Sequence, residues 1–240
     1  KIFSRLGKEI SVSVKVGGSD LDSNIRLRSA VSAAKALNMP KDNIQRAIKK
    51  GEGNDPESNY EEVRYEGYGP SGVAVIVEAM TNNKNRTASE IRSTFGKYGG
   101  NLGGTGSVSH GFKRLGVITI SKHLVKENEL FEFIVENGSE DLEISESDYI
   151  IYCDPNILHS LNEQINDRFG ETLSSGLTWK NNINVEVQKD NAEKLFKLLN
   201  TLEENEDVQN VSSNFEVSEE VLATLTQWER IFNGRQSMET

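Results

Sequence analysis

Apolar residues recur at helical spacing through the first fifty residues. The clearest stripe, in a helix that we expect to begin near Asp22, consists of Leu27, Ala30, Val31, Ala34 and Leu37. Gly17 and Gly18 separate it from an earlier helix around residues 4–16. Asn38 offers a cap and Pro40 begins a third helix, whose apolar face consists of Ile44, Ala47 and Ile48. Three short amphipathic helices predict a small helical bundle.

Strand patterns begin after a break in composition. Residues 51–58 combine Gly, Pro and acidic residues without an apolar one, which is typical of an interdomain linker. Strands are expected over 62–67 and 72–79, joined by a turn, and a further strand near 107–112. Between them we expect a helix that begins at Thr87, which with Glu90 has the form of a capping box, and that ends at Gly99 and Gly100.

The second half of the chain alternates strands and helices in a recognisable order. Strands at 117–121, 141–144, 149–153 and 177–187, with helices at 127–137 and 156–169, give the βαββαβ order of a ferredoxin-like sandwich. A helix containing Ala192, Leu195, Leu199 and Leu202 and a strand at 208–211 are left over, followed by a helix over 217–240. We expect them to return and complete the middle domain, which lacks a second helix to cover its sheet.

The predicted fold class is therefore α+β, with three domains. They are an N-terminal basic helical bundle over 1–52, a discontinuous middle α+β domain over 58–115 and 188–240, and an inserted ferredoxin-like domain over 116–187. The longest apolar run, near 73–77, is far shorter than the roughly 20 residues that a membrane helix needs. No membrane partner is expected.

Charge is distributed very unevenly along the chain. The sequence has 27 Lys and Arg against 37 Asp and Glu, a net charge of -10 that by itself disfavours a nucleic-acid binder. Residues 1–50, however, hold eleven Lys or Arg and four acidic residues, a net charge of +7. The remainder sums to -17, and its acidity is concentrated after Gly116. The first segment alone has the electrostatic character of a phosphate-binding surface.

Enzymatic chemistry finds no support in the motifs. His110, His123 and His159 lie in three separate elements without metal-ligand spacing, so no metal and no cofactor is expected. No nucleophile with an orienting base can be assembled, so no catalytic residue is expected. Cys153 lies in a strand-like run without an intrachain partner, which fits a reducing compartment, and we expect a buried hydrophobe rather than a nucleophile.

Candidate nucleic-acid contacts are the cations of two segments. Lys and Arg on helix faces commonly serve solubility only, but their density in an otherwise acidic chain favours binding. The first set is Arg5, Lys8, Arg26, Arg28, Lys35, Lys41, Arg46, Lys49 and Lys50, of which Arg46, Lys49 and Lys50 are expected on one exposed face. The second set, which could extend the surface across the linker, is Lys84, Arg86, Arg92 and Lys97.

Two further features have competing interpretations. The glycine-rich stretch over 99–106 runs from a helix into a strand, so a flexible connector is favoured over a nest of amides for a phosphate. Tyr65, Tyr68 and Phe112 could stack on bases, but strand alternation favours core packing for Phe112. No base-reading motif is present, so sequence-specific readout is not evident.

An ordered series of motifs closely resembles the YebC/PmpR family. The segments that carry the resemblance are Gly17-Gly-Ser-Asp20, Asn38-Met-Pro-Lys-Asp-Asn-Ile44, Ala47-Ile-Lys-Lys-Gly51, Tyr65-Glu-Gly-Tyr-Gly-Pro70, Asn85-Arg-Thr87 and Gly99-Gly-Asn-Leu-Gly103. The resemblance covers the chain to about Gly116 in motif detail and the rest in element order. It implies the same three domains. Family members usually carry a basic stretch before the position of Lys1, so we expect the surface described above to be incomplete.

The resemblance also implies a non-enzymatic regulatory function, with two accounts. One is a DNA-binding transcriptional regulator in the bacterial cytoplasm. The other is a ribosome-associated translation factor that binds ribosomal RNA, located in the mitochondrial matrix if the source is eukaryotic. Both need a basic phosphate-binding surface.

A third possibility is a protein-interaction scaffold in which the acidic part binds the partners and the basic bundle docks on the acidic part. The oligomeric state is not determined by the sequence, and a monomer is consistent with it.

Overall fold

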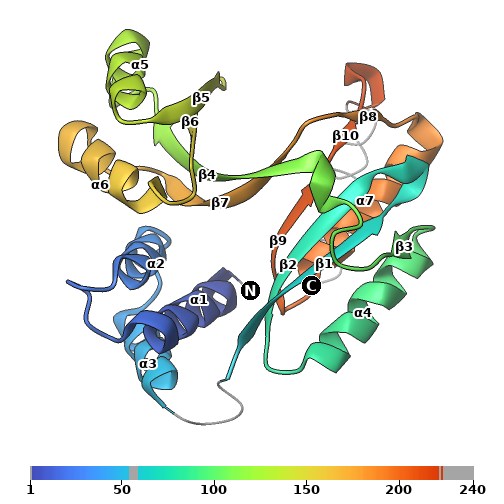
Figure 1. Cartoon of the computed structure of the whole chain (residues 1–240), viewed down its shortest axis with the longest axis horizontal. Coiled ribbons are helices and arrows are strands. Elements are labelled where there is room, and N and C mark those ends of the chain that lie inside the picture. The colour runs from blue at the N-terminus through green and yellow to red at the C-terminus, as the bar shows by residue number, and fades with distance from the viewer. Residues whose placement is uncertain (1, 54–58, 222, 224–240) are drawn as a thin grey trace, which may run out of the picture. The chain divides into compact units, whose positions relative to one another are not determined.

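The computed structural model describes residues 2–53, 59–221 and 223, and its fold class is α+β as predicted (Figure 1). The chain divides into two compact units. The first comprises residues 1–61, 80–82 and 113–180, and the second comprises residues 62–79, 83–112 and 181–240. The division into three domains stays a prediction. Among the described residues, no helix is long and apolar enough to cross a membrane.

The first unit begins with three helices, α1 (Ile2–Gly17), α2 (Ile25–Ala36) and α3 (Lys41–Glu52). Their buried core includes Ile10, Leu27, Ala30, Val31 and Ala34, which confirms the predicted apolar stripe up to Ala34. Leu37, the last member of the predicted stripe, is exposed because α2 ends at Ala36. Helix α2 begins at Ile25 rather than near Asp22, because Asn24 caps it: its side-chain oxygen accepts a hydrogen bond from the backbone N–H of Leu27 at 3.0 Å.

The turn between α2 and α3 depends on Asn38. This residue has a positive φ of 59°, and its N–H donates to the carbonyl of Lys35 at 2.9 Å. Asn tolerates this left-handed conformation better than most residues, so Asn38 closes α2. Pro40 is the residue that precedes the first turn of α3, and its carbonyl accepts from the N–H of Ile44 at 3.2 Å.

Helix α3 extends into the predicted linker and packs closely against α1 there. The linker was expected to start at Gly51, but α3 continues to Glu52 and Gly51 is buried. A Cβ atom at Gly51 would lie 2.5 Å from the carbonyl oxygen of Ser11 and 2.7 Å from Cβ of Val14. Gly51 is therefore a packing residue. The rest of the predicted linker lies largely outside the described residues, since positions 54–58 are not among them.

The first unit also contains a ferredoxin-like α/β sandwich. Its sheet has the strand order β5-β6-β4-β7, so the first and third strands of the βαββαβ motif are the inner ones. The elements are β4 (Phe112–Ser121), α5 (Glu127–Glu136), β5 (Ser139–Ile144), β6 (Asp148–Cys153), α6 (Leu158–Phe169) and β7 (Ser174–Asn181). Residues of α5 and α6, such as Leu130 and Leu161, share a buried core with Ile118 and Ile151 of the inner strands.

Two strand predictions in this region are wrong. Residues 107–112 do not form a strand: Ser109–Gly111 is a turn of 3-10 helix, and β4 begins only at Phe112. The expected strand over 177–187 is broken at Asn181, and the short β8 (Val185–Glu186) pairs instead with β10 (Phe215–Glu216). Phe112 is buried, as the alternation predicted.

The second unit is a sheet of order β3-β1-β2-β9 with two helices. Its elements are β1 (Glu61–Tyr68), β2 (Ala74–Thr81), α4 (Lys84–Lys97), β3 (Asn101–Leu102), α7 (Lys189–Glu204) and β9 (Val208–Ser213). Its core joins Val75 and Val77 of β2 with Phe95 of α4 and Leu195 of α7. The leftover helix and strand therefore do complete this sheet, with β9 antiparallel to β2. The helix predicted over 217–240 lies mostly outside the described residues.

Replacing Gly51 by alanine tests the close approach of α3 to α1. We expect Gly51→Ala to lower the free energy of unfolding by about 1–3 kcal/mol, since the added methyl group overpacks against the Ser11 carbonyl. Gly96 is the matched control, because it too lies one residue before the end of its helix, yet a Cβ there meets nothing within 4 Å. Gly96→Ala should be neutral or stabilising by up to about 1 kcal/mol. Urea titration followed by circular dichroism measures both, and equal effects would contradict the packing described.

Candidate nucleic-acid interface

The exposed side of α3 carries the cations that helical spacing placed there. Arg46, Lys49 and Lys50 are exposed, whereas Ile44 and Ala47 on the opposite side are buried. Lys49 and Lys50 lie in the last turn, where cations also interact favourably with the helix dipole. A contribution to helix stability thus accompanies any role in binding.

A groove of about 470 Å³ opens beside these cations within the first unit. Residues of α1 and α3 line it together with Met39 and Tyr60, which lie outside both helices. Gly7, Met39 and Ala47 make part of the lining apolar. Lys8, Arg46 and Lys50 contribute positive charge to the same groove. The groove therefore combines a small apolar surface with cations, in the most basic part of the sequence.

Tyr60 is held in this groove by two lysines. The ammonium of Lys50 donates to the Tyr60 hydroxyl at 3.3 Å, and the ammonium nitrogens of Lys8 and Lys50 each lie 5.3 Å from the ring centre. Such distances allow cation–π attraction. Lys8 itself is buried and donates to the carbonyl oxygen of Met80 at 3.3 Å. Sequence patterns did not indicate Tyr60, which lies ten residues after Lys50 and beyond the predicted linker.

Several other predicted contact residues form ion pairs or lie apart from the groove. Arg26 pairs with Glu9 at 2.8 Å and Arg28 pairs with Glu163 at 2.5 Å, so both guanidinium groups already have carboxylate partners. Arg5 is half-buried, and Lys35 and Lys41 are exposed, but none of the three lines the groove. The structure thus brings Lys8, Arg46 and Lys50 together.

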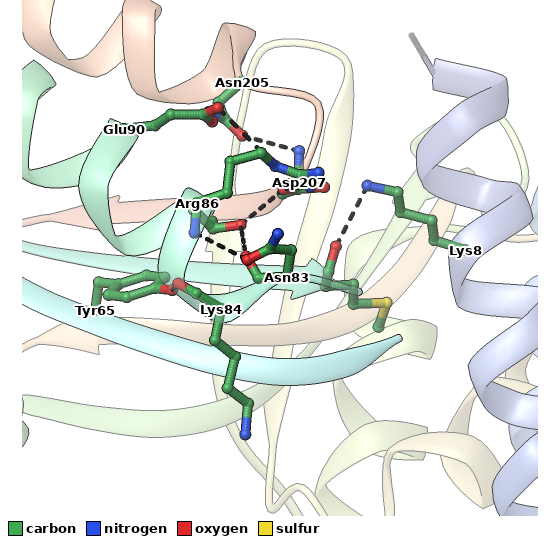
Figure 2. A network of polar contacts seen from close by, with 10 residues as sticks. Lys8, Tyr65, Asn83, Lys84, Arg86, Glu90, Asn205 and Asp207 are labelled. Atoms are coloured by element: carbon green, nitrogen blue, oxygen red, sulfur yellow. Dashed lines mark hydrogen bonds and ion pairs between the residues drawn. The ribbon is translucent and has the colours of Figure 1, made fainter. Parts of the chain in front are cut away.

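The second basic set lies on α4, in the second unit. Lys84, Arg92 and Lys97 are exposed. Arg86 differs, because its guanidinium nitrogen lies 2.6 Å from the carboxylate of the buried Asp207 (Figure 2). The same carboxylate oxygen accepts from the hydroxyl of Thr87 at 2.7 Å. Arg86 therefore fastens α4 to the turn before β9.

The predicted capping box at Thr87 and Glu90 is wrong. Helix α4 begins one turn earlier, at Lys84, and is capped by Asn83, whose side chain accepts from the N–H of Arg86 at 3.1 Å. Thr87 is inside the helix and Glu90 accepts from the side chain of Asn205 at 2.7 Å (Figure 2). The backbone N–H of Thr87 donates to the Asn83 carbonyl, as in a helix interior, while its hydroxyl donates to Asp207.

The glycine-rich stretch is anchored by an internal carboxylate. The buried side chain of Glu66, a residue of β1, accepts hydrogen bonds from the N–H groups of Val108 at 3.0 Å and Ser109 at 2.9 Å. Burial alone raises the pKa of Glu66, but bonds from Val108, Ser109 and Gly106 outweigh it and lower the pKa to about 2. Glu66 thus occupies the amide at the end of the stretch, that of Gly106, together with the two that follow it, so these amides are not available to a phosphate. The Gly103 N–H also donates to the Glu66 carbonyl, so the stretch is tied to β1 rather than a loose connector.

Cys153 is buried, as predicted, and has no disulfide partner. Burial, followed by the nearby Asp154 and Glu140 carboxylates, raises the pKa of its thiol to about 11. Among the described residues, no group of three His, Cys, Asp or Glu side chains is placed to hold a metal ion.

Two family models match almost the whole described chain. Residues 1–54 match the TACO1/YebC protein N-terminal domain, and residues 60–215 match the TACO1/YebC second and third domain. The boundary between the matches falls at the end of α3, where the basic helical part ends.

A solved structure is similar to the chain over nearly its full length. It is the crystal structure of a conserved hypothetical protein from Aquifex aeolicus, with 45% sequence identity and a TM-score of 0.84. The similarity covers 91% of this chain and 90% of that one.

Substituting Glu66 tests the anchoring of the glycine-rich stretch. The depressed pKa means that the carboxylate stabilises the fold above its ordinary pKa of 4.5, and that this contribution is lost as the pH falls from 4.5 through about 2. Glu66→Gln should therefore lower the free energy of unfolding at pH 7 by on the order of 3 kcal/mol, and by progressively less as the pH approaches 3. Glu62→Gln, at an exposed position on the same strand, is the control. A pH-independent difference between Glu66→Gln and wild type would contradict the linkage.

The raised thiol pKa predicts an unreactive cysteine. At pH 8 a pKa of about 11 leaves roughly one thiol in a thousand ionised, and burial shields it further. We expect an aromatic disulfide reagent to modify Cys153 very slowly in the native protein and rapidly in denaturant. Rapid modification under native conditions would show that the strand opens far more readily than its burial implies.

Proposed function

Because this chain belongs to the TACO1/YebC family of regulatory proteins, we propose that it is a non-enzymatic regulator that binds nucleic acid, acting as a DNA-binding transcriptional regulator. The observation that carries the proposal is the cationic side of α3, formed by Arg46, Lys49 and Lys50. Three exposed cations on one helix face can approach neighbouring phosphates together, releasing counterions from the nucleic acid.

The other predicted contacts take different parts in this proposal. Lys35 and Lys41 are exposed and add to the positive potential of the bundle, and Lys84, Arg92 and Lys97 offer a second set on α4. Arg26, Arg28 and Arg86 have carboxylate partners, so contact with phosphate would require them to give up an existing ion pair. Their main role in the proposal is to orient the helices that carry the exposed cations.

Neutralising the α3 cations tests the proposal. In Arg46→Gln/Lys49→Gln/Lys50→Gln, DNA affinity should fall, and the slope of log K against log salt should become shallower by about 0.9 for each phosphate that the protein no longer neutralises. Fluorescence anisotropy with a labelled duplex at several salt concentrations measures both quantities.

The control carries the same change of net charge in the acidic part of the chain. Lys126→Gln/Lys189→Gln/Lys194→Gln should leave the affinity and the slope near their wild-type values. Equal behaviour of the two triple variants would reject α3 as the binding surface. It would favour the scaffold, in which protein partners contact the acidic part.

A translation factor on ribosomal RNA is the second candidate, and the groove beside α3 favours it. A concave site with an aromatic ring is of little use on a uniform duplex, whereas folded RNA presents loops and unpaired bases. Co-sedimentation with ribosomes from a lysate separates the candidates. Retention in the ribosomal fraction after DNase treatment, abolished in the α3 triple variant, supports the translation factor; absence from that fraction supports the transcriptional regulator.

A further inference from the structure

The groove beside α3 has a lining that matches the chemistry of a nucleotide. Its apolar part, at Gly7, Met39 and Ala47, suits the face or edge of a base. Arg46 and Lys50 are exposed and line the same groove, where they can reach a phosphate. An aromatic ring beside cations is the combination by which single-stranded nucleic acids are bound without sequence preference.

The size of the groove limits what can enter. Its volume of about 470 Å³ lies toward the lower end of the range for small-molecule sites, which is roughly 300–1,000 Å³. That space accommodates about one nucleotide unit. It does not accommodate a double helix, which can only lie across the opening.

Tyr60 is already positioned before any ligand arrives. The Lys50 ammonium bonds its hydroxyl at 3.3 Å, and the Lys8 ammonium lies 5.3 Å from its ring centre while bonded to the Met80 carbonyl. A ring fixed in this way loses little conformational freedom when a base stacks on it. Lys8 is buried, so its role here is to position the ring rather than to contact phosphate.

We propose that this groove binds one unpaired nucleotide of a single-stranded segment, with its base against Tyr60 and its phosphates at Arg46 and Lys50. In a duplex the bases are paired and stacked inside, so only an unpaired or extruded nucleotide can bring its base to the groove. The inference rests on the proposed function and specifies the form of nucleic acid that α3 and its neighbours prefer.

The experiment compares single strands with duplexes on the full chain. Labelled ten-nucleotide single strands of RNA and of DNA, and a ten-base-pair duplex, are titrated by fluorescence anisotropy at one salt concentration. Tyr60→Leu should weaken single-strand binding by about five- to hundredfold, the effect of removing one stacked base, and leave duplex binding within about twofold. Tyr60→Phe keeps the ring and loses only the hydrogen bond from Lys50, so it should weaken single-strand binding much less than Tyr60→Leu does.

A second variant blocks the groove without removing any charge or ring. Apart from the backbone of its own helix, a Cβ atom at Gly7 would have only the Met39 methyl group within 4 Å, at 3.9 Å, so a side chain there begins without a clash. Gly7→Leu should fill the apolar part of the groove and weaken single-strand binding as Tyr60→Leu does. Tyr152→Leu is the matched control, since Tyr152 also has a lysine ammonium 4.0 Å from its ring centre but lies in the acidic sheet. Thermal unfolding confirms that each variant is folded.

The outcomes separate the groove from the wider surface. If Tyr60→Leu and Gly7→Leu change single-strand and duplex binding equally, or change neither, the groove proposal is overturned; weaker binding by the α3 triple variant would then still support the proposed function. Adenosine monophosphate that binds as tightly as a ten-nucleotide strand would also overturn it, because the site would then serve a free nucleotide. Comparison of the RNA and DNA strands shows which sugar the groove accepts.

Discussion

The close contact of α3 with α1 at Gly51 is the constraint on which the basic surface depends. No side chain fits between Gly51 and the Ser11 carbonyl, and the Ser11 hydroxyl donates to the carbonyl of Ala47 at 2.8 Å across the same interface. These contacts fix the rotation of α3 about its axis. Once Ala47 faces α1, the 100° step between residues directs Arg46, Lys49 and Lys50 outward. Packing at one glycine therefore decides where the positive charge lies.

The second unit uses its buried carboxylates to fasten its own backbone. Glu66 ties the glycine-rich stretch to β1, and Asp207 joins Arg86 and Thr87 of α4 to the turn before β9. Each carboxylate occupies donors that a free anion would otherwise contact. Amides and guanidinium groups that looked available in the sequence are thus part of the fold. Both units carry exposed cations, but Arg46 and Lys50 of α3 also line a groove, which is why the proposed interface is centred on α3.

Local patterns in the sequence predicted the elements and most of the fold. The apolar stripes gave the three N-terminal helices, and the element order gave the ferredoxin-like sandwich and the return of α7 and β9 to the middle sheet. The errors arose where residues outside a local motif decide the structure. Thr87 has the sequence of a helix cap, but Asn83 caps α4 one turn earlier, and the Thr87 hydroxyl donates to Asp207, far along the chain.

The candidate site could be predicted only in part from local sequence patterns. Helical periodicity placed Arg46, Lys49 and Lys50 on an exposed face, but no periodicity shows that Arg26 meets Glu9 or Arg28 meets Glu163. Tyr60 was missed because its position in the groove depends on Lys8 and Lys50, which come from two different helices. A residue in no regular element carries no pattern from which its neighbours can be inferred.

The pairing of β2 with β9 has a consequence for how the chain folds as it is synthesised. β2 is the most apolar strand of its sheet, and the partner that covers one of its edges, with Val77 opposite Val211, is made only after the entire ferredoxin-like segment. Until then this edge offers unpaired backbone groups to any other extended chain. The intervening segment has its own core and can fold first. The sheet of the second unit therefore cannot be completed until β9 has been synthesised. Until then a chaperone bound at the open edge of β2 would protect the chain, and a chain left with this edge exposed would tend to aggregate.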